Sequence, residues 1–226
     1  MVVRSTSGAA AARDLQGLGV TEFPAEFPAG FFDRADPGPD ASFYAPDRFV
    51  THIDPGAIAA VGALYEELAI SGEVLDLMSS WVSHFVTAPR RLVALGMNAN
   101  ELAANPQAES RVVHDLNVDP VLPFADASFD AVTCCVSVDY LVRPVDVFRE
   151  VARVLRPGGP FALTISNRCF PTKAIRAWLR TDAAGHIDIV REYFRSAGGF
   201  TDPTSQLRTP STPPGDPLWA VWATRA

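Results

Sequence analysis

The segment at residues 111–166 constrains the fold more than any other part of the chain. It reads RVVHDLN, then LPFADASFDAVTCC, VFREVARVLRPGG and PFALTIS, which predicts a strand, a second strand after a turn, an amphipathic helix closed by Pro-Gly-Gly, and a third strand. Apolar strands that alternate with helices indicate an α/β protein whose parallel sheet is covered on both faces. Because such sheets bind ligands at the carboxyl ends of their strands, we expect functional residues just after each strand.

The same alternation continues on both sides of this segment. Asp54 and Pro55 open a predicted helix, and apolar stretches predict strands at 74–78 and 91–96. Further helices are predicted at 98–104, 172–179 and 185–197, and the last strands near 199–201 and 218–224. The chain therefore divides into an N-terminal segment at 1–54 and one α/β domain at 55–226. In the first segment, residues 1–20 read as a mobile tail, and the Pro- and Phe-rich stretch at 23–46 predicts an irregular arm.

Composition limits the kinds of partner. The chain of 226 residues with 48% hydrophobic content can bury one substantial core. Its net charge of −7, without a run of basic residues, disfavours binding to nucleic acid. No apolar run is long enough to span a membrane, and the three cysteines have no disulfide or metal-ligand spacing. We expect a cytoplasmic protein, a monomer or homodimer, without a membrane partner or a metal.

Two motifs in the central segment carry a family resemblance. LPF-x4-FD running into a strand, and LRPGG before the next strand, resemble class I S-adenosylmethionine-dependent methyltransferases of the type 11-like group. The resemblance covers about residues 55–226. It implies a Rossmann-like fold, with a mostly parallel seven-stranded sheet, helices on both faces and a closing antiparallel pair of strands. It also implies S-adenosyl-L-methionine as cofactor and a small-molecule acceptor. The alternative is a non-catalytic protein of this fold that serves as a binding or interaction module.

The loop after the first predicted strand departs from the family pattern. The family places an acidic residue and three glycines there, whereas this chain reads VLDLMSSWVSHF, with Asp76 kept and Met78, Ser80 and Val82 at the glycine places. It resembles a branch in which a DLMSSWVSH-like loop replaces the glycines and GMN follows the second strand. The resemblance places Asp76, Met78 and Ser80 at the donor, and we expect Trp81 to shield the methionine part. The alternatives are an Asp76 that only orients the loop and a Trp81 that packs under a following helix.

Residues after the next strands complete the predicted donor site. Met97 and Asn98 belong to GMN, and Asn98 lies 22 residues after Asp76, near the usual offset of a ribose-binding acid. Asn98 equally suits the N-cap of the helix that follows. The resemblance places Asp115 at the adenine amino group and Leu116 on its ring, although Asp115 also suits a solvated turn. Ser137 follows the fourth strand, where donor and acceptor meet in this family.

Three residues are candidates for a catalytic base, which is needed only if the acceptor must lose a proton. Asp139 and Tyr140 follow the fourth strand, and their alternatives are a helix cap and a core aromatic residue. His84 lies just beyond the modified loop, and its alternative is a structural histidine.

Other residues are candidates for the acceptor side. Arg168 suits an acidic acceptor, or else a surface ion pair. Tyr44, Arg48 and His52 belong to the arm and are placed to close over the cofactor, with Tyr44 as a predicted acceptor-binding residue. The arm is then either a lid or a segment packed permanently on the domain.

Overall fold

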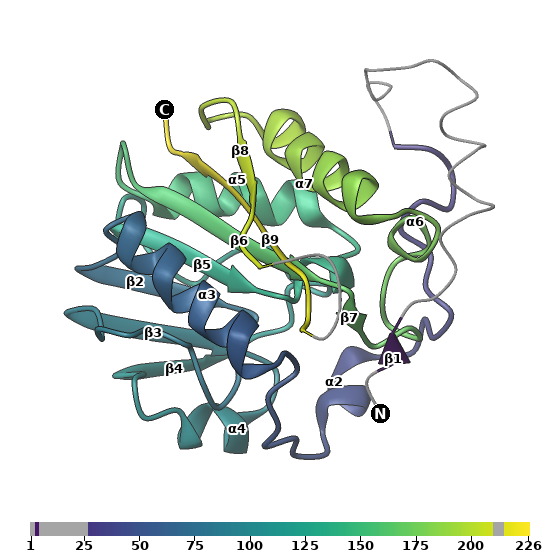
Figure 1. Ribbon diagram of the computed structural model, residues 1–226, viewed down its shortest axis with the longest axis horizontal. Coiled ribbons are helices and arrows are strands. Elements are labelled where there is room, and N and C mark those ends of the chain that lie inside the picture. The colour runs from purple at the N-terminus through teal and green to yellow at the C-terminus, as the bar shows by residue number, and fades with distance from the viewer. Residues whose placement is uncertain (1–2, 5–26, 210–214) are drawn as a thin grey trace.

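The computed structural model describes residues 3–4, 27–209 and 215–226 of the chain. Seven strands form one sheet in the order β4-β3-β2-β5-β6-β9-β8 (Figure 1). The first five pair in parallel, whereas β9 runs antiparallel between β6 and β8. Their bounds are Glu73–Leu77 (β2), Arg91–Gly96 (β3), Ser110–Val113 (β4), Ala131–Cys135 (β5), Pro160–Ser166 (β6), Thr204–Leu207 (β8) and Leu218–Thr224 (β9). The mostly parallel seven-stranded sheet confirms the predicted fold class.

Helices cover both faces of the sheet. In Figure 1, α3 (Pro55–Glu67) lies across one face, while α5 (Pro144–Val154) and α7 (Ala183–Ala197) lie on the other. Both layers form because successive side chains of a strand point to opposite faces. Leu75 accordingly joins the apolar cluster that includes α5 and α7, and Val74 joins the cluster that includes α3. None of the helices in the described ranges is long and apolar enough to cross a membrane.

The ends of the helices follow local signals in the sequence. Asp54 caps α3 by accepting a hydrogen bond from the Ala57 amide at 2.9 Å. Asp182 caps α7 in the same way through Gly185, and α7 ends at Gly198, where φ is +70°. Since φ in this range favours glycine, Gly198 explains where the helix stops.

Two elements differ from their predicted extent. The helix predicted at 172–179 is only α6 (Arg176–Leu179), because the Lys173 and Ala174 amides both donate to the Phe170 carbonyl and form a turn before it. The strand that pairs with β9 is β8 rather than 199–201, where an isolated bridge joins Phe200 to Arg225. The closing antiparallel pair itself is present.

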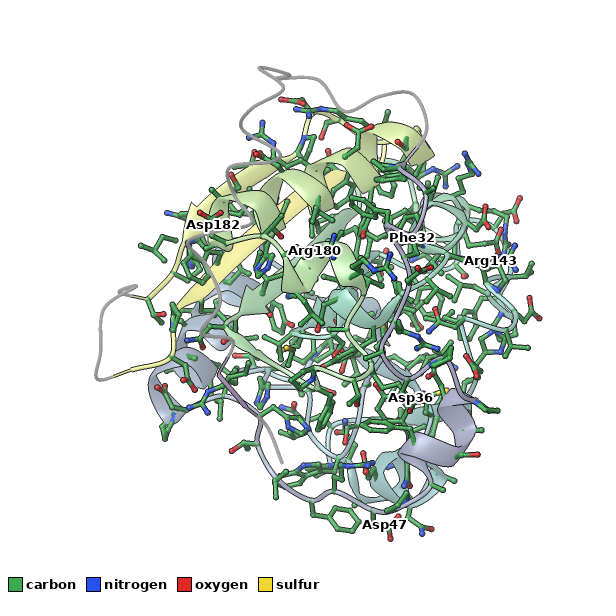
Figure 2. The ribbon with its side chains drawn as sticks, turned by 90° about the vertical axis from the view of Figure 1, so that its right-hand side faces the viewer. Phe32, Asp36, Asp47, Arg143, Arg180 and Asp182 are labelled. Carbon is green, nitrogen blue, oxygen red and sulfur yellow. The ribbon has the colours of Figure 1, made fainter. Side chains whose placement is uncertain are left out.

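The arm runs beside the carboxyl edge of the sheet. Figure 2 faces this side and shows the arm passing from Phe32 through Asp36 to Asp47. It contains a short helix, α2 (Asp40–Tyr44), so the prediction of a wholly irregular arm was wrong there. Pro39 presets the backbone just before α2, and Asp40 places a carboxylate in its first turn. The predicted tail lies outside the described residues, apart from β1 (Val3–Arg4), which pairs with β7 (Arg168–Cys169).

The first half of the arm is anchored in the core. Phe27, Phe31 and Phe32 pack against the cluster under α7, where the rings of Phe27 and Tyr193 lie 5.7 Å apart. Lys173, the only lysine in the chain, is completely buried. Its ammonium donates to the Gly38 carbonyl at 2.8 Å and lies 3.0 Å from the Asp36 carboxylate and 3.1 Å from that of Asp40.

Candidate functional site

A cavity opens where the carboxyl ends of the parallel strands meet the arm. It holds about 1300 Å³ of empty space, counting its open mouth. Its walls come from the segments after β2, β3, β4 and β5, from β7 and from the arm. The predicted site residues that line it are Tyr44, Asp76, Met78, Ser80, Trp81, His84, Met97, Asn98, Asp115, Leu116, Ser137, Tyr140 and Arg168. Segments far apart in the sequence therefore form one cavity, as the strand order requires.

Asp139 is the predicted site residue that does not line this cavity. It is buried in a short 3-10 turn, η1 (Val138–Tyr140), and successive residues of such a turn point about 120° apart. Tyr140 therefore lines the cavity while Asp139 does not. Burial raises the pKa of Asp139 well above its usual value, and its Oδ2 has no hydrogen-bond partner among the described residues. The prediction of Asp139 as a base in the cavity was wrong in placement.

The loop after β2 closes on the neighbouring strand instead of using its own glycines. The Ser79 amide donates to the Leu95 carbonyl at 2.8 Å. A Cβ on Gly96 would lie only 2.1 Å from the Ser79 carbonyl oxygen, so the close approach depends on the glycine of β3. Met78, at the first glycine place, has a φ of +54°. This left-handed conformation is costly for a side chain larger than hydrogen and is typical of functional sites.

Trp81 is held by the arm. No helix follows β2 at 78–90, so the alternative that placed Trp81 beneath such a helix was wrong. The Trp81 indole donates to the Val50 carbonyl at 3.2 Å, and its ring lies 6.4 Å from that of Phe49, edge to face. The indole therefore lines the cavity and connects the loop after β2 to the arm.

Asp76 is a buried carboxylate beneath the loop after β2. Its two carboxylate oxygens accept hydrogen bonds from Ser79 Oγ at 2.6 Å and Thr133 Oγ1 at 2.7 Å. Burial raises the pKa of Asp76, and hydroxyl hydrogen bonds oppose that rise. The carboxylate orients the loop through the hydroxyl of Ser79, which is the alternative role considered for Asp76, and it also lines the cavity.

Asn98 connects the second strand to the arm. Its Oδ1 accepts from the Asn100 and Glu101 amides, which confirms the predicted N-cap of α4 (Ala99–Ala104). Its Nδ2 donates to the Tyr44 carbonyl at 3.0 Å and to the Asp47 carboxylate at 2.9 Å. Since the polar atoms of Asn98 are engaged in this way, its contact with a ribose stays a prediction that requires the arm to shift. Met97 lies beside it, half-buried in the cavity wall.

Asp115 presents an unengaged carboxylate oxygen. Its Oδ1 accepts from the Asn117 and Val118 amides and forms a turn after β4, whereas Oδ2 has no hydrogen-bond partner in the described part of the chain. Leu116 beside it is buried in the wall. The turn alternative is therefore present, and the same side chain still has an acceptor to offer a ligand.

The segment after β5 carries a second strained residue. Val136 has a φ of +45°, which is unusual for a β-branched residue, and it lines the cavity beside Ser137. The Ser137 hydroxyl donates to the Cys135 carbonyl at 2.8 Å. The Tyr140 hydroxyl accepts from the Phe170 amide at 2.9 Å, and burial raises the pKa of Tyr140 well above its usual value. Tyr140 thus stays protonated at neutral pH and suits a hydrogen-bond donor rather than a base.

The remaining wall combines arginines, histidines and rings. Arg168 donates through Nε to the buried Asp216 at 2.8 Å, so the ion pair considered for it is present, although with a buried partner. Arg48 lies over the Phe43 ring at 4.8 Å, and His52 packs edge-on against Phe170.

Burial lowers the pKa of both His52 and His84, which keeps these imidazoles neutral at pH 7. His84 has a φ of +58°, a third non-glycine residue of the cavity wall in the left-handed region.

Several lining residues were not identified from the sequence, among them Glu101, Asn117 and Phe170. Glu101 is buried and accepts from the Arg48 amide and the Ser80 hydroxyl, although its position in α4 suggested only a helix residue. Asn117 donates to Asp40 and to the Tyr140 carbonyl, and Phe170 forms the wall beside His52. Only Asn117 carried a signal, because it belongs to the polar segment after β4, which ends at Val113. Among the described residues, no group of three or more His, Cys, Asp or Glu side chains is placed to hold a metal ion.

Known proteins share parts of this sequence. Residues 71–163 match the family described as Methyltransferase domain. The chain is 34% identical over 135 residues to methyltransferase GfsG of Streptomyces halstedii. The aligned region covers 53% of this chain and 48% of that protein. It is 42% identical over 65 residues to 27-O-demethylrifamycin SV methyltransferase of Amycolatopsis mediterranei (strain S699), covering 29% of this chain and 24% of that protein. The chain thus spans about half, or less, of the length of these curated relatives.

A solved structure shares the fold. Geranyl diphosphate C-methyltransferase from Streptomyces coelicolor A3(2) is similar with a TM-score of 0.52 and 17% identity, over 82% of this chain and 97% of that chain. At this identity the likeness speaks for the fold and not for the acceptor. The chain is thus similar to a methyltransferase domain over residues 71–163, and it shares the fold of class I methyltransferases.

Proposed function

We propose that this chain binds S-adenosylmethionine in the cavity and transfers its methyl group to a small-molecule acceptor. The observation that carries the proposal is the Asp115 side chain, which lines the cavity just after β4 and whose Oδ2 has no hydrogen-bond partner among the described residues. A carboxylate oxygen there suits the exocyclic amino group of adenine, and Leu116 offers the ring an apolar wall. The donor would lie over the ends of β2, β3 and β4, and the acceptor over the ends of β5 and β6.

The chemistry needs little beyond alignment and exclusion of water. The methyl group leaves a sulfonium sulfur as a neutral thioether departs, so a correctly held acceptor attacks without a metal or a nucleophilic side chain. The cavity suits this task because Trp81 and the arm cover it while Tyr140 offers a hydroxyl donor. The acceptors named for the curated relatives are small molecules or a carrier-bound group, and we favour the first kind because the arm partly covers the cavity.

Thermal stability with and without ligands tests the proposal. S-adenosylhomocysteine should raise the melting temperature, since a ligand that binds only the folded state stabilises it, whereas NAD(H) should not. Asp115→Asn keeps an oxygen for the turn but replaces the unengaged acceptor with an NH2 donor. We expect it to weaken binding of S-adenosylhomocysteine by about 10- to 100-fold, corresponding to one hydrogen bond to a charged group.

A control variant and three contrary results complete the test of the proposed donor site. Asp188→Asn makes the same change on the exposed side of α7 and should leave binding intact. Full affinity in Asp115→Asn would remove the adenine assignment, and a wild type stabilised only by NAD(H) would remove the proposal. Binding of S-adenosylmethionine with no methyl transfer to any acceptor would favour the non-catalytic alternative.

A further inference from the structure

His52 is a residue of the cavity wall whose imidazole has an unpaired nitrogen. It lies on the arm, and its Nδ1 is buried without a hydrogen-bond partner among the described residues. Its ring is fixed edge-on against Phe170, with 5.3 Å between the centroids. A buried polar atom left unpaired costs about 1–3 kcal/mol. Because the His52 residue also lines the cavity, we look for the partner of this buried atom in a ligand whose binding shifts the arm enough to expose it.

The surroundings of His52 keep its imidazole neutral. Burial is the main cause that lowers its pKa, the Arg48 guanidinium lowers it further, and the Glu101 carboxylate acts in the opposite direction. With its proton on Nε2, the neutral ring accepts a proton at Nδ1. His84 is also neutral, but it belongs to the loop after β2, on the donor side of the proposed arrangement. His52 adjoins Phe170, which follows β6 and β7 on the acceptor side.

The charges on this side favour an anionic acceptor over a cationic one. Arg48 lines the cavity with its guanidinium against carbonyl groups and the Phe43 ring, whereas the charge of Arg168 is balanced by Asp216. The nearby carboxylates are engaged, since Asp40 pairs with Arg34 and Lys173, and Glu101 accepts from Ser80. An ammonium group would be repelled by the Arg48 guanidinium here, whereas a phenolate or enolate is stabilised by it.

The rings on this side favour a planar acceptor. Phe170 and Tyr140 lie 5.9 Å apart with their planes inclined by 36°, and both line the cavity. Aromatic walls of this kind pack best against a flat apolar body. A planar molecule with an acidic hydroxyl group satisfies the rings, Arg48 and the histidine together.

We propose that, in the methyl transfer proposed above, His52 is the catalytic base for an acceptor with an acidic hydroxyl group of the phenol or enol type. The acceptor hydroxyl gives its proton to Nδ1 as its oxygen bonds to the methyl carbon. The carbon–sulfur bond breaks and its electron pair stays on sulfur, which leaves as the thioether of S-adenosylhomocysteine. The products are a methyl ether and an imidazolium, and the imidazolium returns its proton to water.

A coloured phenol tests this inference without turnover. We use 4-nitrophenol, whose phenolate absorbs at longer wavelength, with protein loaded with S-adenosylhomocysteine at a pH where the free probe is mostly protonated. The wild type should show the phenolate band on binding, and His52→Gln should lose it. His186→Gln is the matched control, because its ring stacks on Trp178 outside the cavity lining, and it should keep the band.

Methyl transfer to matched acceptors gives a second readout. With S-adenosylmethionine, 4-nitrophenol should be methylated and 4-nitrobenzylamine should not, and His52→Gln should slow transfer by about 10²- to 10⁴-fold. An unchanged phenolate band in His52→Gln, no band in the wild type, or preferred methylation of the amine would overturn the inference. Because the inference rests on the proposed function, calorimetry with S-adenosylhomocysteine comes first. Failure of that ligand to bind refutes the proposed function, whereas binding without a phenolate band refutes the role of His52 alone.

Discussion

Replacing Asn98 by Asp should release the arm while leaving the helix it caps intact. The introduced carboxylate keeps an oxygen that accepts from the amides at the start of α4, as the Asn98 side chain does now. The Nδ2 donor is lost, and with it the bonds to the Tyr44 carbonyl and the Asp47 carboxylate. The second oxygen of the new carboxylate then faces a carbonyl and another carboxylate, so the contact becomes repulsive.

The size of the effect follows from the number of bonds. Nδ2 has two hydrogens, so it makes two full hydrogen bonds among its acceptors, and each contributes about 0.5–1.5 kcal/mol. The closed arm should therefore lose about 1–3 kcal/mol, which increases its opening equilibrium by about 5- to 150-fold. The charge repulsion adds to this loss. Because Lys173 and the phenylalanines hold the first half of the arm independently, only residues near 43–52 should open.

Hydrogen exchange followed by mass spectrometry measures this opening directly. Peptides covering 43–52 should exchange faster in Asn98→Asp, while peptides from α4 and from 27–38 should not change. Asn98→Ala is the comparison, because it also removes the cap and should expose α4. Equal exchange at 43–52 in the wild type and Asn98→Asp would show that the Asn98 hydrogen bonds do not hold the arm closed. If these residues form a lid, S-adenosylhomocysteine should slow their exchange in the wild type, and the absence of any slowing would favour an arm packed permanently in place.

Three further changes test the packing and electrostatics of the site. Burial raises the pKa of Asp139 in the folded protein, so the folded state keeps a proton that the unfolded state loses above the ordinary pKa of aspartate. The free energy of unfolding therefore falls as pH rises from that ordinary pKa to the raised pKa of the folded state. Asp139→Asn should remove a slope of up to about 1.4 kcal/mol per pH unit from urea denaturation between pH 5 and 7, and an unchanged slope would contradict this. Gly96→Ala places a Cβ against the Ser79 carbonyl and should lower the melting temperature and weaken donor binding together, whereas intact binding would show that the loop adapts. Lys173→Met removes the buried ammonium that pairs with Asp36 and Asp40 and donates to the Gly38 carbonyl, so it should lower the urea midpoint of unfolding, and an unchanged midpoint would show that the arm does not depend on it.

The sequence predicted the regular part of the fold because that part follows from periodicity. The apolar runs of β2, β3 and β6 and the striped helix α5 are local patterns, and they were located to within a residue or so. The end of β4 likewise indicated Asp115 as a residue after a strand. The parallel order of the strands then brought these ends to one edge.

The sequence did not reveal how the arm completes the site. The contacts of Glu101 with Arg48 and of Asn98 with Tyr44 join residues more than 50 positions apart, and no local pattern encodes them. The loss of three loop glycines suggested a disturbed loop, whereas the close approach depends on Gly96 of the neighbouring strand. The misplacement of Asp139 came from a single 3-10 turn, which has too few residues to show a period.

Isothermal titration calorimetry of S-adenosylhomocysteine into the wild-type protein shows directly whether the cavity binds the methyl donor's product. The cavity presents the Asp115 Oδ2 acceptor, a neutral His52 and covering contacts from Trp81 and the arm. The account predicts saturable binding of one ligand per chain, with a matching rise in melting temperature, because a ligand at 100 times its Kd adds about 2.7 kcal/mol to the folded state. No heat of binding and no change in melting temperature at millimolar ligand would contradict the account.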